Sequence, residues 1–320
     1  FFAISAMAAA MITSCSSEDE LSQSNYPSDN IIRVTAGVNN AKTRADGTGT
    51  EMKNDFSLTI VNKNAPKYTY TDKVFSKKSG DWACSETLLW QKSDALVDIV
   101  AFAPAQTGKF NGVYAEGSIK PITYSVASDQ STSSDKNDLL YYYAKDFNPG
   151  ESLDKGKLNI KFNHAFCMID INVTLGTEFN KPSIQTTSPI IKVTLGGTKI
   201  AANVNVTNAA SVVTASETAA ATDITTTNGS FTTAANAETN AKSCFSCIAI
   251  PQTVAANTFK VSLMTAGKRY EWTSDKEITL QSGYRYTLNL SMGNDVVLLK
   301  GGGITATKWT EISGGSLETE

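Results

Sequence analysis

The sequence predicts an all-β fold with two β-sandwich domains in series, and three observations predict it. Short segments that alternate apolar and polar residues recur from about residue 31 onward, separated by Gly, Asn, Ser and Pro. No stretch combines the apolar spacing and the capping residues of an amphipathic helix. With 320 residues, the chain is long enough for one large domain or two ordinary ones, and we expect two.

The first ten residues, FFAISAMAAA, are apolar and small. This stretch is too short to cross a hydrocarbon core of about 30 Å as a helix, and it is typical of the apolar part of a signal peptide. It has no initiator Met and no basic residues ahead of it. We therefore expect residues 1–14 to be a signal peptide that is truncated at its start.

Cys15 directly follows the small residues Thr13 and Ser14, an order that resembles the lipobox of bacterial lipoproteins. The acidic run that comes next, SSEDE, resembles a surface-export tag of some Gram-negative anaerobes. We expect Cys15 to carry the lipid anchor, palmitate included, with residues 15–30 as a tether at the cell outer membrane surface. The alternative is an ordinary signal peptide cut near this point, which leaves a free Cys.

Residues 31–176 form the predicted N-terminal domain, and its most informative stretch is LNIKFNHAFCMIDINVTL at 158–175. Apolar residues occupy one phase of the alternation up to Met168 and the opposite phase from Ile169 onward. A slip of one residue exchanges the two faces of a strand. The pattern therefore predicts a bulge, or a change of sheet, near Met168.

The predicted C-terminal domain spans residues 188–320, after a linker at 176–188 that contains Pro182. Alternation and Gly-containing turns predict three hairpins in it, at 191–206, 259–272 and 278–292. The Thr/Ala/Asn-rich stretch 207–243 predicts long loops with one or two edge strands.

His164 is the only histidine, and it lies on the apolar face of its predicted strand. Because no constellation of acids or cysteines surrounds it in the sequence, we expect a buried, hydrogen-bonded structural residue. Asp94 and Asp98 flank a strand and are more typical of a solvated face than of a glycosidase pair.

Cys244 and Cys247 have the spacing of a redox pair or half a zinc site, but no second CxxC or nearby His supports either chemistry. Whether they form disulfides with the remaining cysteines, Cys84 and Cys167, stays open. No catalytic or cofactor fingerprint is present, so we expect no enzyme, cofactor or metal. A net charge of −3 gives no electrostatic reason to expect nucleic-acid binding.

Seven segments in order resemble the fimbrillin family, the type V pilins of Gram-negative anaerobes, over nearly the whole mature chain. They are IIRVTAGVNNAKTRADG, SETLLWQKSDALVDIVAFAPA, NDLLYYYAKDF, FNHAFCMIDINV, IPQTVAANTFKVSLMTAGKRYEWTS, ITLQSGYRYTLNLSM and ITATKWTEISGG. The resemblance implies two transthyretin-like sandwiches in tandem. It also implies a subunit of cell-surface fimbriae that is exported as a lipoprotein and has a role in adhesion.

The resemblance further implies that an Arg-specific protease removes the N-terminal strand, so that a strand from another fimbrial subunit replaces it. Arg44 and Arg33 are the candidate cleavage sites, and residues 31–38 are the strand to be removed. Arg44 precedes a Gly/Asp/Thr stretch that is typical of an exposed loop, where proteolysis concentrates. The alternative is that Arg44 is a solvated charge in a loop and is not a cleavage site.

The C-terminal stretch is either a donor strand or a last strand packed at home, and the shaft, anchor and tip roles stay open. The main alternative is a monomeric surface lipoprotein that binds glycan or host protein. Its exposed aromatic residues would be Tyr141, Tyr142 and Tyr143.

Overall fold

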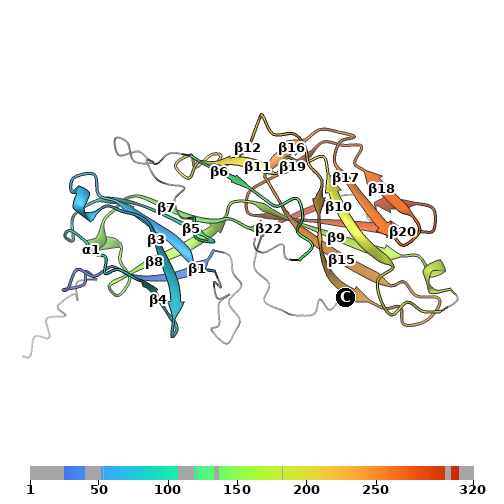
Figure 1. Ribbon diagram of the computed structural model, residues 1–320, viewed down its shortest axis with the longest axis horizontal. Helices are drawn as coiled ribbons and strands as arrows, with labels where there is room; N and C mark the ends of the chain where they lie inside the picture. The colour runs from blue at the N-terminus through green and yellow to red at the C-terminus, as the bar shows by residue number, and fades with distance from the viewer. Residues whose placement is uncertain are drawn as a thin grey trace, which may run out of the picture.

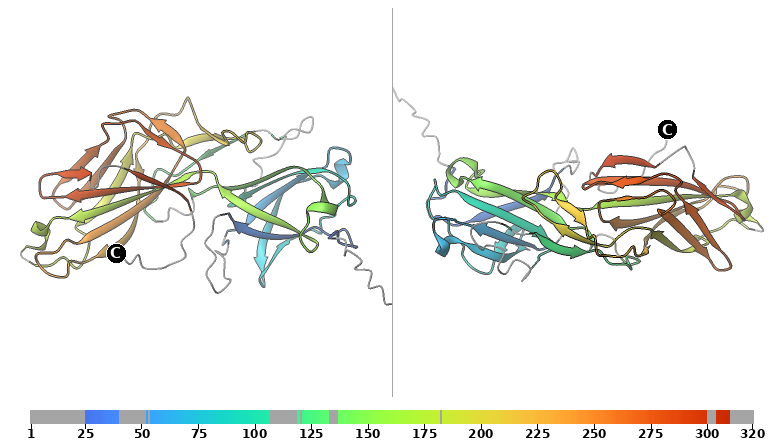
Figure 2. Two further views of the ribbon diagram at one scale, coloured as in Figure 1. Left: turned by 180° about the vertical axis from the view of Figure 1, so that it is seen from behind. Right: turned by 90° about the horizontal axis from the view of Figure 1, so that it is seen from above.

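The computed structural model describes residues 25–39, 52, 54–106, 119, 121–132, 137–181, 183–299 and 304–309. Within them the chain is nearly all β, as the alternation predicts, and it forms two lobes along the long axis (Figures 1 and 2). No helix in the described residues is long and apolar enough to cross a membrane.

The first lobe, called the barrel lobe, is a sheet that closes on itself in the order β1-β4-β3-β2-β5-β7-β8. A 3-10 turn, Pro66–Tyr68, and a one-turn helix α1, Pro149–Ser152, lie between its strands. The strands are β1 (Arg33–Val38), β2 (Phe56–Val61), β3 (Tyr70–Lys78), β4 (Asp81–Cys84), β5 (Val97–Ala103), β7 (Leu140–Phe147) and β8 (Lys157–His164).

The second lobe, called the sheet lobe, contains four further sheets, of which the largest has the order β14-β15-β9-β20-β21, with β22 also on β20. A 3-10 turn, Thr177–Asn180, follows β9. The strands are β6 (Ile122–Ser125), β9 (Cys167–Leu175), β10 (Ile190–Gly196), β11 (Ala201–Val204), β12 (Val213–Ala215), β13 (Ile224–Thr225), β14 (Thr227–Thr232), β15 (Lys242–Ala249), β16 (Gln252–Val254), β17 (Lys260–Thr265), β18 (Arg269–Thr273), β19 (Ile278–Leu280), β20 (Tyr284–Met292), β21 (Val297–Leu299) and β22 (Thr305–Lys308).

Each lobe has its own apolar core, and β5 contributes to both. Its sequence VDIVAFA is buried throughout. Ile99 and Ala101 point into the core of the barrel lobe, whereas Val100 and Phe102 belong to the core of the sheet lobe. A strand that is covered on both faces cannot alternate apolar and polar residues, which explains its unbroken apolar run.

The predicted change of sheet near Met168 is confirmed. β8 ends at His164 in the barrel, and β9 begins at Cys167 in the sheet lobe, paired with β15 and β20. Ala165 and Phe166 make the crossing, and both are fully buried. The phase of the apolar pattern switches because the two strands bury their side chains in different cores.

Sheet membership differs from the predicted division at 176–188, which assigned all of 158–175 to the first domain. The chain crosses into the sheet lobe at Ala165, and the predicted linker follows β9 instead of preceding the second lobe. β6, from the first half of the chain, also pairs with β11. One continuous alternating stretch can serve two sheets, so the boundary lies at its change of phase and not at its end. The transthyretin-like class of the lobes stays a prediction.

Of the three predicted hairpins, only the one at 259–272 is confirmed, as β17 paired with β18. At 191–206 the strands form, but β10 pairs with β13 and β17 while β11 pairs with β6 and β12. At 278–292, β19 pairs with β16 and β20 pairs with β9. In both of the hairpins that do not form, the chain turns at a glycine, Gly197 or Gly283, and continues into another sheet. The stretch 207–243 holds three short strands, β12, β13 and β14, each at the end of its sheet.

Candidate functional site

β1 closes the barrel lobe, and its two edges are held unequally. On one side it pairs in parallel with β8 along its whole length, from Arg33 opposite Lys157 to Val38 opposite Phe162. On the other side the pairing with β4 is a single residue pair, Val34 opposite Trp82.

The chain just before β1 is held on one edge, by the segment at 88–90. The Ile32 amide donates to the Leu88 carbonyl at 2.9 Å, and the Trp90 amide donates to the Asn30 carbonyl at 2.8 Å. The described pairing therefore holds residues 30–32 on one edge, holds both edges at Val34, and holds the β8 edge from there onward. We call the junction of β1 with β4 and β8 the seam.

The inner face of this segment covers the core of the barrel lobe. Ile32 and Val34 are each 5% exposed, and Ala36 and Val38 pack against the same core. The alternation of the sequence IIRVTAGV thus places every second side chain inward. Taking β1 away would uncover an apolar slot and leave an edge of β8 without its hydrogen-bond partners.

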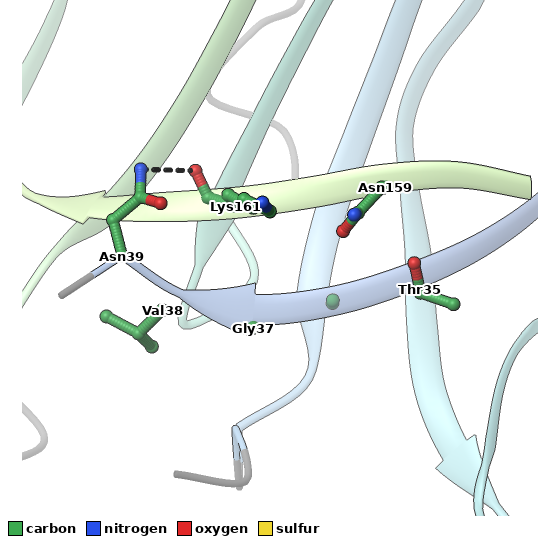
Figure 3. A pocket seen from close by; sticks show the side chains of 7 residues that line it. Thr35, Gly37, Val38, Asn39, Asn159 and Lys161 are labelled. Carbon is green, nitrogen blue, oxygen red and sulfur yellow. Dashed lines mark hydrogen bonds between the residues drawn. The ribbon is translucent and has the colours of Figure 1, made fainter. Parts of the chain in front are cut away.

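An open groove of about 340 Å³ lies along the seam. It is lined by Thr35 to Val38 of β1, by Asn39 just after this strand, and by Asn159 and Lys161 of β8. Figure 3 shows Asn39 reaching toward β8, while Val38 lies on the other side of the strand. The Asn39 side-chain amide donates to the Asn163 side-chain oxygen at 2.8 Å, and its backbone amide donates to the Phe162 carbonyl at 2.6 Å. These bonds tie the end of β1 to β8.

Charged side chains mark the start of β1. The Arg33 guanidinium binds the Asp29 carboxylate at 2.6 Å. The hydrogen bond from Arg33 lowers the pKa of Asp29 to about 2, and the same bond raises the pKa of Arg33. Lys157 of β8 lies 3.9 Å from Asp81 of β4, so an ion pair links the two strands that flank β1. These pairs are exposed and contribute little to stability.

Of the predicted site residues, Arg33 is described and lies in β1 with an exposed side chain. Cys15 and Arg44 lie outside the described residues. The predicted strand at 31–38 is present as β1, although Ile31 itself makes an isolated bridge to Leu89.

The described part of the C-terminal stretch, residues 296–299 and 304–309, pairs with strands of its own chain. β21 pairs with β20 at Leu290 to Met292, and β22 pairs with the same strand at Tyr284 to Thr287. Trp309, which follows β22, is 5% exposed and belongs to the core of the sheet lobe.

His164 is buried and hydrogen-bonded, as predicted, but it has an acidic neighbour that the sequence did not suggest. Its Nδ1 lies 2.7 Å from the Asp138 carboxylate, and both residues are less than a tenth exposed. Trp309 stacks on its ring with centroids 3.7 Å apart. Asp138 and Trp309 are 26 and 145 positions away in the chain, so no local pattern could have predicted the cluster.

Cys244 and Cys247 lie on β15, where residues three positions apart face opposite sides of the sheet. Cys244 is half-buried and Cys247 is fully buried, so the two thiols do not converge on one site. Burial raises the pKa values of Cys247 and of Cys167. All four described cysteines are free thiols, and no group of three metal-ligating side chains occurs among the described residues.

Asp94 and Asp98 have different surroundings, and the prediction of a solvated face is confirmed for Asp94 and wrong for Asp98. Asp94 is exposed and pairs with Lys92 at 3.0 Å. Asp98 is 4% exposed, binds the Lys63 ammonium at 2.9 Å and accepts the Asp146 amide at 2.9 Å. The hydrogen bond to Asp98 raises the pKa of Lys63. Asp98 is therefore part of a structural ion pair.

Tyr141, Tyr142 and Tyr143 are half-buried in β7 and not freely exposed. Tyr141 and Tyr143 pack against the core of the sheet lobe, and Tyr142 packs against that of the barrel lobe. Burial raises the pKa of all three phenols.

The partner strand β4 was missed in the sequence, although a signal for it is present. Ser79 and Gly80 connect β3 to β4, and both have positive φ, at 49° and 97°. A two-residue turn with positive φ at both positions is the preferred connection of a tight hairpin. The Ser-Gly pair between the alternating segments could therefore have predicted β4 beside β3.

The chain matches the model of a family described as fimbrillin-like over residues 43–309. β1 lies ahead of the matched span. A search of curated proteins finds none that matches.

Solved structures share the fold at low sequence identity. A candidate cell adhesion protein from Bacteroides ovatus is similar at 15% identity and a TM-score of 0.62, over 89% of this chain and 99% of that one. Another from Bacteroides uniformis has 14% identity and a TM-score of 0.58, over 89% and 100%. A fimbrial protein from Bacteroides vulgatus has 16% identity and a TM-score of 0.55, over 88% and 99%. Likeness at these identities indicates a shared fold.

Proposed function

Because the chain belongs to the fimbrillin-like family, we propose that it is a structural subunit of cell-surface fimbriae that assembles by strand exchange after β1 is removed. The observation that carries this proposal is the seam. β1 covers an apolar core, but its two edges are held unequally. The described pairing with β8 spans the whole strand, whereas the described pairing with β4 is the single pair of Val34 and Trp82.

Removing β1 would expose apolar surface and leave a vacant position in the sheet that a replacement strand can occupy. Ile32 and Val34 are buried, and burying one such side chain stabilises a fold by about 1.5–3 kcal/mol. The vacated slot would expose this apolar surface together with the unpaired backbone groups of β8. A strand from a neighbouring subunit repairs both losses at once, which is the physical basis of strand addition.

The pairing of β1 favours Arg44 over Arg33 as the cleavage site. Arg33 pairs with β8, and its neighbours Ile32 and Val34 are held by Leu88 and by β4. A protease would have to break this pairing to reach Arg33. The half of β1 nearest to Arg44 is held by β8. A cut after Arg44 also frees the complete strand, whereas a cut after Arg33 leaves most of β1 in place.

Export as a lipoprotein anchored through Cys15 is part of the proposal. A cut after Arg44 would separate the two lobes from that anchor, so processing and release from the membrane would be one event. Cys15→Ala should move the protein out of the membrane fraction. Recovery of the variant in the membrane fraction to the same extent as the unchanged protein would contradict the anchor.

Digestion with an Arg-specific protease tests the assembly step. We expect the cut protein to form rods and SDS-resistant ladders on gels, because inserted strands dissociate slowly. Arg44→Ala should block both without lowering the free energy of unfolding, and Arg33→Ala is the matched control that should still assemble. Folded monomer at high concentration after complete cleavage would contradict the subunit role.

A second candidate, a monomeric surface lipoprotein that binds glycan, is favoured by one observation. A pocket of about 450 Å³ is lined by Tyr141, Tyr284 and Gln281, among other residues. Tyrosine rings and amides are common in sites that bind sugars. Cut protein that stays monomeric, with sugar binding that is lost in Tyr284→Ala, would favour this candidate.

A further inference from the structure

Polar side chains of β1 and β8 stand opposite one another along the groove at the seam. In the parallel register of the two strands, Thr35 lies opposite Asn159 and Gly37 lies opposite Lys161. The side chains of Thr35, Asn159 and Lys161 are exposed. Figure 3 shows Thr35 and Asn159 turned toward each other between the strands, with Lys161 next along β8. The groove therefore presents a hydroxyl, an amide and an ammonium close together.

The fold does not use these three polar groups. Among the described residues, none forms a hydrogen bond or an ion pair with the side chains of Thr35, Asn159 or Lys161. Lys157, on the same strand, differs because it lies 3.9 Å from Asp81. The described lining of the groove contains no carboxylate, so no acid in the groove neutralises the charge of Lys161.

Gly37 leaves the floor of the groove open opposite Lys161. It lies in the interior of β1, where a glycine weakens a strand. Its φ is not in the left-handed region, and a Cβ at this position would meet nothing within 4 Å among the described residues. The backbone and the packing of β1 therefore do not require a glycine. A strand glycine of this kind is typical of a place where a ligand approaches the backbone closely.

We propose that this groove binds an acidic saccharide, with its carboxylate or sulfate at Lys161 and its hydroxyls at Asn159 and Thr35. A lysine ammonium donates charge-assisted hydrogen bonds to an anion, and amide and hydroxyl groups both donate and accept, as sugar hydroxyls do. The volume of about 340 Å³ lies within the range of ligand pockets, about 300–1,000 Å³. The exposed side chains of the lining are all polar, which suits a ring with several hydroxyls better than a peptide, whose anchors are mostly aromatic.

The site belongs to the uncut chain, because β1 supplies Thr35 and Gly37. It needs neither cleavage nor assembly, so it can fail or succeed independently of the proposed fimbrial role. It is also separate from the pocket lined by Tyr141 and Tyr284, whose described lining contains no charged side chain.

Calorimetric titration of the uncut protein with three related sugars tests the role of Lys161. Sialyllactose carries a carboxylate, sulfated lactose carries a sulfate, and lactose carries neither group. We expect at least one of the two charged sugars to bind roughly tenfold or more tightly than lactose, because a hydrogen bond from a charged donor is stronger than one between neutral groups. The sugar that binds identifies the anionic group. Lys161→Met should abolish the preference for charge, and Lys157→Met, on the same strand, is the matched control that should retain it.

Gly37→Thr tests the floor of the groove with a readout that a merely structural glycine would not give. We expect the affinity for the charged sugar to fall by roughly tenfold, because the added side chain occupies the space above the strand. The unfolding temperature should not fall, since a Cβ there meets nothing within 4 Å and a β-branched residue suits a strand.

Three results would overturn the site. The first is equal affinity of the uncut protein for all three sugars, or binding of none of them. The second is binding that Lys161→Met and Gly37→Thr both leave unchanged. The third is binding that is lost in Tyr284→Ala, which would assign the sugar to the other pocket.

Discussion

Asp98 shows how a residue that resembles a site can be a structural support. Its carboxylate is withdrawn from solvent and shared between the Lys63 ammonium, at 2.9 Å, and the Asp146 amide, at 2.9 Å. Lys63 is more than a third exposed, so water weakens its share of the interaction. Removing Asp98 therefore acts mainly by taking away a buried hydrogen-bond acceptor.

We expect Asp98→Ala to lower the free energy of unfolding by about 1–3 kcal/mol, because the Asp146 amide and the Lys63 ammonium both lose their buried acceptor. Asp94→Ala, four positions earlier, is the matched control and should leave stability unchanged. Urea unfolding followed by tryptophan fluorescence measures both. Equal stability of the two variants would mean that the Asp98 pair is not structural.

At the scale of elements, the sequence predicted strands better than it predicted their partners. The phase switch in 158–175 located the crossing between sheets because burial imposes period-two alternation. The hairpin at 259–272 was predicted because its partners are adjacent in sequence. β20 was assigned to the wrong hairpin because its partner β9 lies more than a hundred residues upstream, and alternation carries no information about pairing at that range.

Gly197 illustrates why a correct turn prediction gave the wrong pairing. It has φ of +86°, as a glycine turn after β10 requires, and a Cβ there would collide with the Thr258 carbonyl. The turn therefore packs against the segment ahead of β17, and the chain continues into another sheet instead of folding back onto β10.

Gly197→Ala should lower the free energy of unfolding by about 2–4 kcal/mol, from the left-handed backbone together with the collision. Gly267→Ala, in the β17 to β18 turn, is the control, because a Cβ there meets nothing within 4 Å. Thermal or urea unfolding of the two variants measures the difference in their free energies of unfolding. A Gly197→Ala protein as stable as the control would show that this turn is not constrained.

At the scale of the whole molecule, the seam and the stacking of Trp309 on His164 both depend on contacts between residues that are far apart in the sequence. The sequence indicated the strand at 31–38 and its inward alternation, but not that it closes a barrel between β4 and β8. It contained Trp309 and His164 without any sign that they meet. The family resemblance supplied the idea of a removable strand, and the unequal pairing of β1 gives it a physical basis.

The central claim is that removal of β1 opens a slot that accepts a strand. The most direct measurement is the binding of a labelled peptide of residues 30–39 to protein cut after Arg44 and purified from its released fragment. We expect saturable binding at one peptide per chain, no binding to uncut protein, and loss of binding when the peptide carries Val34→Asp, since that side chain enters the apolar core. Cut, folded protein that binds neither peptide would contradict the account.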